Sequence, residues 1–362
     1  MGQRAVQCKS MTFAREAMRP IAAALRWWAQ ACRSRALAFV WIILCALLAV
    51  QDGLAQDATD GSSAAYPRRP VRLVVPYAPG GGLDILARML AQRLTERWGQ
   101  GVVVDNRPGA SGMVGAQQVS KAVPDGYTLI IVATEHITAP RVYHRHLYEP
   151  VADFAPISQV SAQSYLLVVH PSLPVHSVAE FISYVKVSGR SFLYTSAGTG
   201  GVGHLSGEMF KAMADIQMTH VPYKGTGPAV NDTVGGQVLA MFSNPLAVVP
   251  HVKSGRLRLL ATTGPQRIAS LPDTPTIAES GLNGFATLGW NGILAPAGTP
   301  VAIVRIIARA VSEIVRAPEM RDRIAGDGAE PVGGTPEEFT ERMTIDELRW
   351  AGIIANMKID PE

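Results

Sequence analysis

Two glycine-rich turns, each between a predicted strand and a predicted helix, constrain the fold of this chain more than any other feature. The first, at residues 76–84, follows an apolar run at residues 71–76 and leads into apolar residues at helical spacing that end at Gly99. The second, at residues 195–204, also follows a short strand pattern and opens a predicted helix. Strand, turn and helix in this order form the unit of α/β proteins, so the sequence predicts two such units.

The rest of the chain repeats this alternation of short apolar runs and longer amphipathic stretches. No tandem repeat of 20–50 residues occurs, which argues against a solenoid. The 307 residues at positions 56–362 already exceed what one hydrophobic core usually supports, so we expect two domains, with parallel sheets covered by helices on both faces. The predicted strands span residues 71–76, 101–105, 128–133, 165–170, 191–195, 218–222, 238–242 and 257–262, and the predicted helices span residues 85–99, 113–122, 177–186, 202–214, 228–235, 300–316 and 337–355.

The first 55 residues differ in composition from the rest. They contain all three cysteines and a net charge of +5, so residues 56–362 carry −1 of the total of +4. An apolar run of 15 residues at 36–50 follows several arginines and precedes small residues, which is the order of a secretory signal peptide. A membrane-spanning helix needs about 20 apolar residues. We therefore predict a signal peptide at residues 1–55, cut near Ala55, with an uncleaved anchor as the alternative. Because its charged region is long, we expect translation to start at Met11 or Met18.

The exported segment, residues 56–362, excludes several function classes. It has no cysteine and is nearly neutral, so it offers no thiol chemistry and no basic surface for nucleic acid. His136, His144 and His146 lack the spacing and partners of a zinc site, so we interpret them as solvated loop histidines and expect no metal.

Nucleotide and hydrolase motifs are weak or missing. The series Gly198-x-Gly200-x-x-Gly203 matches the dinucleotide fingerprint, but Tyr223 stands where the acidic residue of that motif would fall. The sequence contains neither a phosphate-binding loop with Gly-Lys-Ser or Gly-Lys-Thr nor a Gly-x-Ser-x-Gly elbow. We expect no cofactor and no covalent nucleophile.

The glycine turns themselves can bind an anion. Glycines let successive backbone N–H groups face a ligand, and a helix amino terminus adds about half a positive charge. The alternative is that both are ordinary tight turns. Asp84, at the start of the first predicted helix, accepts hydrogen bonds either from the free N–H groups of that helix or from a donor group of a ligand. Lys224 either pairs with Asp232 on the surface or neutralises a ligand carboxylate, and Trp290 is expected to pack in the core.

Further motifs carry a resemblance to a known family. The series at residues 76–88, 103–112, 124–127, 194–198, 220–225, 228–238 and 294–300 resemble, in the same order, those of the Bug-type extracytoplasmic solute receptors of tripartite tricarboxylate transporters. The resemblance covers nearly all of residues 66–360. It implies an α/β, two-domain periplasmic-binding-protein-like fold with a hinge and an interdomain cleft. Its domains would be residues 56–165 plus 290–362, and residues 166–289.

The resemblance also implies a function and a site. The protein would be a monomeric periplasmic receptor, not an enzyme, that closes on a small carboxylate and delivers it to membrane transporter subunits. A sensor that feeds a sensor kinase, and an enzyme in which Asp84 and Glu135 act on a small acid, are the alternatives. By position, the family's ligand-binding residues correspond to Tyr77, Ala78, Gly80, Gly81 and Asp84 in the first turn, to Ser196, Ala197, Gly198, Thr199 and Gly200 in the second, and to Thr134 and Glu135 in a loop after residues 128–133.

Two residues depart from the family pattern. Leu83 stands where many relatives carry a hydroxyl residue before the aspartate, so a side-chain donor is lost. Glu135 puts a carboxylate where many relatives are neutral. If Glu135 lines the cleft, it would repel a second ligand carboxylate and favour a cation or a hydroxyl.

Overall fold

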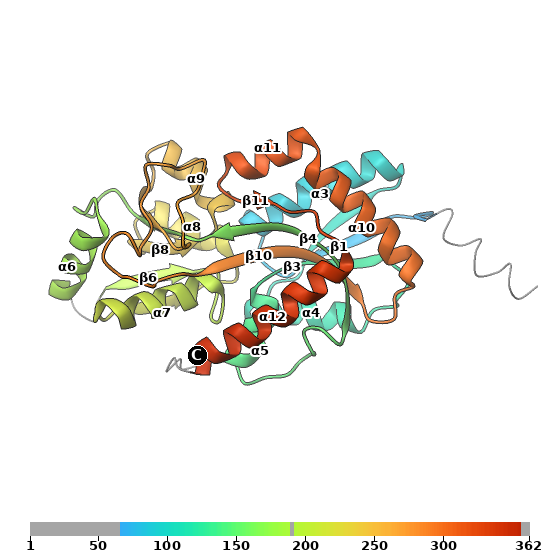
Figure 1. Cartoon of the computed structure of the whole chain (residues 1–362), viewed down its shortest axis with the longest axis horizontal. Helices are drawn as coiled ribbons and strands as arrows, with labels where there is room; N and C mark the ends of the chain where they lie inside the picture. The colour runs from blue at the N-terminus through green and yellow to red at the C-terminus, as the bar shows by residue number, and fades with distance from the viewer. Residues whose placement is uncertain (1–65, 189–191, 356–362) are drawn as a thin grey trace, which may run out of the picture. The chain divides into compact units, whose positions relative to one another are not determined.

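The computed structural model describes residues 66–188 and 192–355; the predicted signal peptide lies outside this part of the chain. Among the described residues, the strands form one sheet of six strands and one of five, which define a first and a second lobe (Figure 1). None of the described helices is both long and apolar enough to cross a membrane. The first sheet contains β1 (Val71–Val75), β2 (Val102–Asn106), β3 (Thr128–Ala133), β4 (Phe154–Ser164), β10 (Leu288–Pro296) and β11 (Glu330–Pro331), and the second contains β5 (Leu166–Val169), β6 (Leu193–Ser196), β7 (Thr219–Pro222), β8 (Ala240–Ser243) and β9 (Arg258–Thr262).

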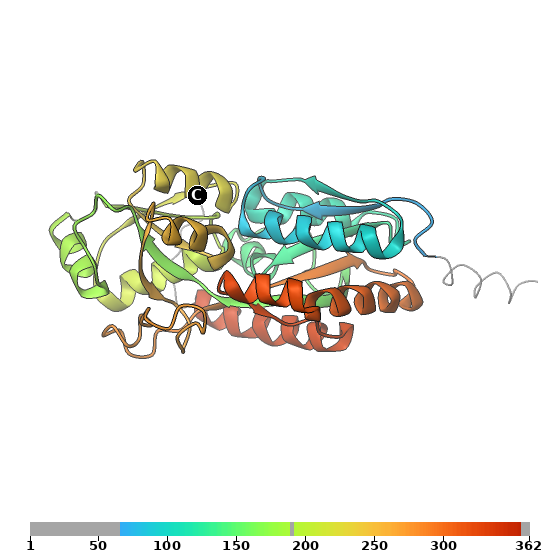
Figure 2. The ribbon, with the colours of Figure 1, turned by 90° about the horizontal axis from the view of Figure 1, so that it is seen from above.

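The first sheet is mixed, with helices on both faces. Its order is β11-β4-β10-β3-β1-β2, in which β1 runs parallel to β2 and β3, whereas β10 runs antiparallel to β3 and β4. The helix α10 packs beside α3 on one face (Figure 2). That face carries α3 (Gly82–Trp98), α10 (Val301–Arg316) and α11 (Pro318–Gly326), and the other carries α4 (Met113–Ser120), which follows the short helix η2 (Ala110–Gly112), α5 (Glu135–Val142) and α12 (Pro336–Ala355).

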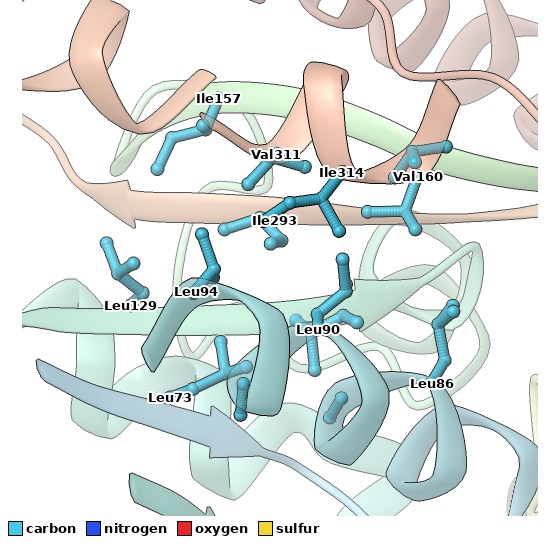
Figure 3. Packing of buried hydrophobic residues seen from close by; sticks show 14 of the residues in the cluster. Leu73, Leu86, Leu90, Leu94, Leu129, Ile157, Val160, Ile293, Val311 and Ile314 are labelled. Atoms are coloured by element: carbon cyan, nitrogen blue, oxygen red, sulfur yellow. The ribbon is translucent and has the colours of Figure 1, made fainter. Parts of the chain in front are cut away.

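Strand β1 shows how the sequence produces this layering. Successive side chains of a strand point to opposite faces, so an entirely apolar strand requires cover on both. Leu73 belongs to one buried cluster with Leu90 of α3 and Val311 of α10 (Figure 3), whereas Val74 belongs to a second cluster on the opposite face with Met113 of α4. Burial on both faces makes the first lobe a rigid support for the turn that follows β1.

The second lobe has the same layered plan. Its strand order is β7-β6-β8-β5-β9, with β6 parallel to β7 and β8, and β5 antiparallel to β8 and β9. Phe181, Phe210 and Phe242 pack together on one face, and Val168 and Met241 pack on the other. The first face is covered by α6 (Val178–Ser188) and α7 (Val202–Ala214), and the second by α8 (Thr226–Val234) and α9 (Pro245–Lys253).

The chain passes between the sheets at the ends of two long strands. Strand β4 ends at Ser164 and β5 begins at Leu166, so Tyr165 alone separates the two sheets at this point. The chain returns through residues 263–287 into β10, whose first residue, Leu288, pairs with Ser164. The paired strands β4 and β10 lie side by side and extend toward the second lobe (Figure 1).

The structure corrects several sequence predictions. Neither sheet is wholly parallel, because β10, β4 and β5 enter antiparallel. The sequence does not predict β4, whose series FAPISQVSAQS is rich in small polar residues, or β10, whose apolar residues are broken by glycines. It also does not predict α9, which contains two prolines, or α11 and β11. The predicted loop at residues 134–136 is the beginning of α5.

Candidate functional site

A small pocket lies between the two lobes, at the ends of strands from both sheets. The volume of this cavity is about 30 Å³, which is enough for about one or two water molecules. Its lining residues include two acids and neither a lysine nor an arginine among the described residues. They are Tyr77, Ala78, Gly81, Leu83, Asp84, Ala133, Glu135, Gln163, Tyr165, Ala197, Thr226, Phe242, Ser243, Asn244 and Asn291.

One wall of the pocket is the amino terminus of α3. The N-cap residue Gly81 and the first-turn residues Leu83 and Asp84 line the cavity, and no side chain caps the helix. The turn before it needs glycine, because Gly80 has a φ of 83° in the left-handed region. Unpaired N–H groups and the helix dipole make this end of α3 favourable for an anion.

Asp84 is held by bonds within the first lobe. Its Oδ2 accepts from the N–H of Gly80 at 3.0 Å, and its two oxygens accept from Arg88 at 3.0 Å each. Asn106 donates to Oδ1 at 2.9 Å. Burial opposes ionisation, but the hydrogen bonds from Arg88, Gly80 and Asn106 outweigh it and lower the pKa of Asp84. Because both oxygens are already occupied, the geometry favours the structural interpretation of Asp84 over direct contact with a ligand.

The opposite wall is formed by the amino termini of α8 and α9. Thr226, the first residue of α8, and Asn244, the N-cap of α9, both line the cavity. Oδ1 of Asn244 accepts from the N–H of Ala247 at 3.2 Å, and its Nδ2 donates to Oγ1 of Thr226 at 3.1 Å. No side chain caps α8. Three helix amino termini, those of α3, α8 and α9, therefore converge on one cavity from two lobes.

The first glycine turn lies directly against the segment that precedes α8. The N–H of Ala78 donates to the carbonyl oxygen of Lys224 at 2.9 Å. A Cβ at Gly225 would lie 3.0 Å from the backbone nitrogen of Ala78, so glycine permits this approach. The Lys224 side chain is exposed, and among the described residues it forms no ion pair with Asp232. The hydroxyl of Tyr223 donates to Asp232 instead.

The floor of the pocket contains a second acid, Glu135, at the start of α5. Its side chain is buried, and the hydroxyl of Tyr165 donates to Oε1 at 3.4 Å. The backbone N–H groups of Glu135 and of Val202 also stabilise the carboxylate, but burial outweighs all three and raises the pKa of Glu135. Asn291 also lines the cavity, and it donates to Oγ of Ser161 at 2.9 Å.

Most of the second glycine turn contacts the first lobe, and of its residues only Ala197 lines the cavity. Oγ of Ser111 donates to the carbonyl oxygen of Thr199 at 2.6 Å, and Oγ1 of Thr138 donates to that of Gly200 at 2.7 Å. Ser111 adopts φ 50°, the left-handed region that rarely accepts a side chain. Apolar residues of α5 and of α7 pack in one buried cluster beside these bonds. This turn therefore joins the lobes.

Histidines fix the shape of the second turn. Nδ1 of His204 accepts from the N–H of Gly200 at 3.1 Å, so this nitrogen carries no proton. Oγ of Ser196 lies 2.8 Å from Nε2 of His220, and the His204 and His220 rings lie 4.1 Å apart. Burial lowers the pKa of His204 to about 4, and burial with the neighbouring His204 and Lys211 lowers that of His220 to about 2.

His136 is not the solvated loop histidine that the sequence predicts. It lies buried in α5, stacked on Tyr148 with ring centroids 4.8 Å apart. Its Nε2 is 2.9 Å from the carbonyl oxygen of Pro150, which can only accept, so Nε2 carries the proton. Burial lowers its pKa to about 4. His144 and His146 are exposed, as predicted, and no group of metal-ligating side chains occurs among the described residues.

The structure brings half of the predicted site residues to the cavity. Tyr77, Ala78, Gly81, Asp84, Glu135 and Ala197 line it, whereas Gly80, Thr134, Ser196, Gly198, Thr199 and Gly200 do not. Sequence reasoning missed lining residues on β3, β4, β8 and β10 and at the starts of α8 and α9. Among the sequence motifs, only the series at residues 220–225 and 228–238 lie near that region, because they flank Thr226 at the start of α8. The missed residues are Ala133, Gln163, Tyr165, Thr226, Phe242, Ser243, Asn244 and Asn291.

Two α/β lobes, two connecting strands and a cavity between the lobes define a two-domain fold of the periplasmic-binding-protein type. The chain belongs to the family of tripartite tricarboxylate transporter receptors, whose family model matches residues 86–359. It is 35% identical over 317 residues to Protein BugT of Bordetella pertussis, covering 86% of this chain and 96% of BugT. The members of this family are periplasmic solute-binding receptors.

Solved structures agree with this assignment. The periplasmic binding protein BugD is 33% identical, with a TM-score of 0.79, over 82% of this chain and 100% of BugD. The R. palustris protein Rpa4515, whose structure contains adipate, is 39% identical, with a TM-score of 0.78, over 80% of this chain and 97% of that chain. The expected family and fold class are thereby confirmed.

Proposed function

We propose that this protein is a periplasmic receptor that binds a small carboxylate between its lobes and delivers it to the membrane subunits of a tripartite tricarboxylate-type transporter. One observation carries the proposal: the amino termini of α3, α8 and α9 meet at a cavity whose described lining contains no lysine or arginine. Backbone N–H groups and helix dipoles are then the anion-binding elements. The adipate in the structure of Rpa4515 is consistent with this class of ligand.

We assign different roles to the proposed site residues. Residues that line the cavity, such as Ala78, Gly81 and Ala197, are placed to contact a ligand. Thr199 and Gly200 accept hydrogen bonds from the first lobe and so are placed to hold the closed state. The proposed site therefore has two parts. The residues placed to contact the ligand are Tyr77, Ala78, Gly81, Glu135 and Ala197. The residues that support the two turns and the start of α5 are Gly80, Asp84, Thr134, Ser196, Gly198, Thr199 and Gly200.

Binding requires the lobes to separate. A cavity of about 30 Å³ is smaller than a four-carbon acid, so a ligand must enter a more open form. We propose domains at residues 56–165 plus 290–362 and at 166–289, which rotate about Tyr165 and the start of β10. A ligand that touches helix ends of both lobes binds the closed form better, so occupancy shifts the population toward closure.

The two alternative functions use the same cavity. A sensor would present the closed form to a sensor kinase instead of a transporter. An enzyme would need an acid–base pair, and Asp84 is already bonded to Arg88, Asn106 and Gly80. The receptor function, with a monomeric protein, no cofactor and no metal, remains our proposal.

Two measurements on the purified protein test this function. Mass spectrometry of small molecules released on denaturation should detect a carboxylic acid. A thermal-shift screen of mono- and dicarboxylates should find compounds that raise the melting temperature, because a ligand that binds only the folded state stabilises it. Failure of every carboxylate, with stabilisation by amines or sugars instead, would contradict the proposal. Chemical conversion of an added ligand would favour the enzyme.

A further inference from the structure

The carboxylate of Glu135 is the one feature of the pocket that carboxylate binding does not explain. The side chain is 4% exposed and lines the cavity. Its Oε2 is buried and has no hydrogen-bond partner among the described residues. A buried, unpaired carboxylate oxygen is costly unless a donor satisfies it.

Glu135 also lacks a compensating cation. Asp84, the other acid of the pocket, is paired with Arg88. Of the ion pairs formed by the described residues, none includes Glu135. The groups that face it are the hydroxyl of Tyr165, the nearby Tyr77 and the amino-terminal backbone of α7, where a Cβ at Gly201 would lie 2.8 Å from Oε1. The Tyr165 hydroxyl donates to Oε1, whereas Oε2 has no partner among the described residues, so Oε2 is the oxygen that can still accept a hydrogen bond.

We propose that Glu135 selects ligands that carry a protonated amine in addition to their carboxylate, and that it rejects dicarboxylates. The ligand carboxylate would lie at the amino termini of α3, α8 and α9, and its ammonium group would donate to Oε2 of Glu135. A zwitterion of this kind satisfies the unpaired oxygen and leaves no uncompensated charge in the closed pocket. A second carboxylate at the same place would face a like charge in a site of low dielectric. This inference rests on the proposed function and specifies its ligand class.

A matched series on one four-carbon skeleton tests the selection by isothermal titration calorimetry. The probes are butanoate, 2-aminobutanoate, 4-aminobutanoate, 4-hydroxybutanoate and butanedioate. We expect one aminobutanoate to bind the unaltered protein about tenfold or more tightly than butanoate, 4-hydroxybutanoate and butanedioate. Glu135→Gln should abolish that preference. Glu347→Gln is the matched control. Glu347 lies on α12 and accepts a hydrogen bond from Arg141, which is on the same helix, α5, as Glu135, but Glu347 does not line the cavity.

The number of protons exchanged on binding gives a second readout. Burial raises the pKa of Glu135, and an ammonium ligand that favours the ionised form should lower that pKa again, so its binding should be accompanied by a pH-dependent release of protons. Titrations in buffers of different ionisation enthalpy measure this release, which Glu135→Gln should remove. If Glu135 instead donates as a neutral acid to a second ligand carboxylate, butanedioate will bind tightest and take up protons.

Each outcome is decisive. Tightest binding of butanedioate, equal binding of the hydroxy and amino probes, or an unchanged preference in Glu135→Gln would overturn the inference and leave carboxylate binding intact. Failure of all five probes would count against the inference and the proposed function together. The series on the unaltered protein keeps the test valid even if Glu135→Gln does not fold.

Discussion

Three buried or largely enclosed histidines make the stability of the fold depend on pH near neutrality. In the native protein the pKa values of His136 and His204 are lowered to about 4 and that of His220 to about 2. The ordinary value is about 6.5. Between about pH 4 and 6.5 the unfolded chain therefore binds protons that the native chain does not, so the free energy of unfolding rises with pH. Acidification from pH 7 to pH 5 should destabilise the protein.

The size of the effect follows from the pKa differences. A histidine with a pKa of about 6.5 unfolded and about 4 folded loses about 2 kcal/mol of stability between pH 7 and pH 5. Three such groups together remove on the order of 5 kcal/mol, which is comparable to the whole stability of a typical domain. Acid should also loosen the second glycine turn, because protonation of His204 at Nδ1 displaces the N–H of Gly200.

Urea unfolding at pH 7 and pH 5, followed by tryptophan fluorescence at constant ionic strength, measures this difference. His136→Gln should reduce it by about 2 kcal/mol, because glutamine keeps a donor for the carbonyl oxygen of Pro150 but does not titrate. His146→Gln is the control: His146 is exposed, so its replacement should leave the difference unchanged. Equal stability at the two pH values would refute the assignment of neutral histidines to the native state.

Two further substitutions test the contact between the lobes and the core. Thr138→Val removes the hydrogen bond to Gly200 without changing the shape of the side chain, and it should weaken closure by about 1 kcal/mol, an about fivefold loss of affinity for the best carboxylate of the screen. Thr344→Val, at an exposed position of α12, should leave this affinity unchanged. Equal affinities of Thr138→Val and the unaltered protein would contradict the role of the contact. Leu90→Ala, in the core between α3 and the first sheet, should lower the free energy of unfolding in urea by about 2–5 kcal/mol. Leu348 is 71% exposed, so Leu348→Ala should lower it by less than about 0.5 kcal/mol, and an equally small effect of Leu90→Ala would contradict the packing.

The sequence predicts the elements whose pattern is local. Strand β1 and helix α10 have strong apolar periodicity, and the turns that end at Gly82 and Val202 break strands and open helices as expected. Strands β4 and β10 are stabilised by pairing with each other across more than 120 residues of chain. No local window of sequence contains that information.

The site residues likewise divide into those that local sequence predicts and those that only the packing of the lobes brings to the cavity. The first glycine turn was predicted because its residues lie together in sequence. Glu135 was identified as a departure from the family, but its position against Gly201 and Tyr165 depends on how the lobes pack. Asn244 and Thr226 reach the cavity only because α8 and α9 begin there, and the prolines of α9 conceal that helix in the sequence.

In the proposed function, helix amino termini, and not basic side chains, bind a carboxylate in this pocket. Calorimetry on Ala197→Asp and Ala197→Asn, with the best carboxylate of the screen, tests it most directly, because Ala197 lines the cavity and the two side chains differ in charge but hardly in size. A carboxylate about 5 Å from the ligand, at an effective dielectric of about 20, costs about 3 kcal/mol. We therefore predict about a hundredfold weaker binding to Ala197→Asp than to Ala197→Asn. Equal affinities of the two variants would show that the ligand carboxylate binds elsewhere.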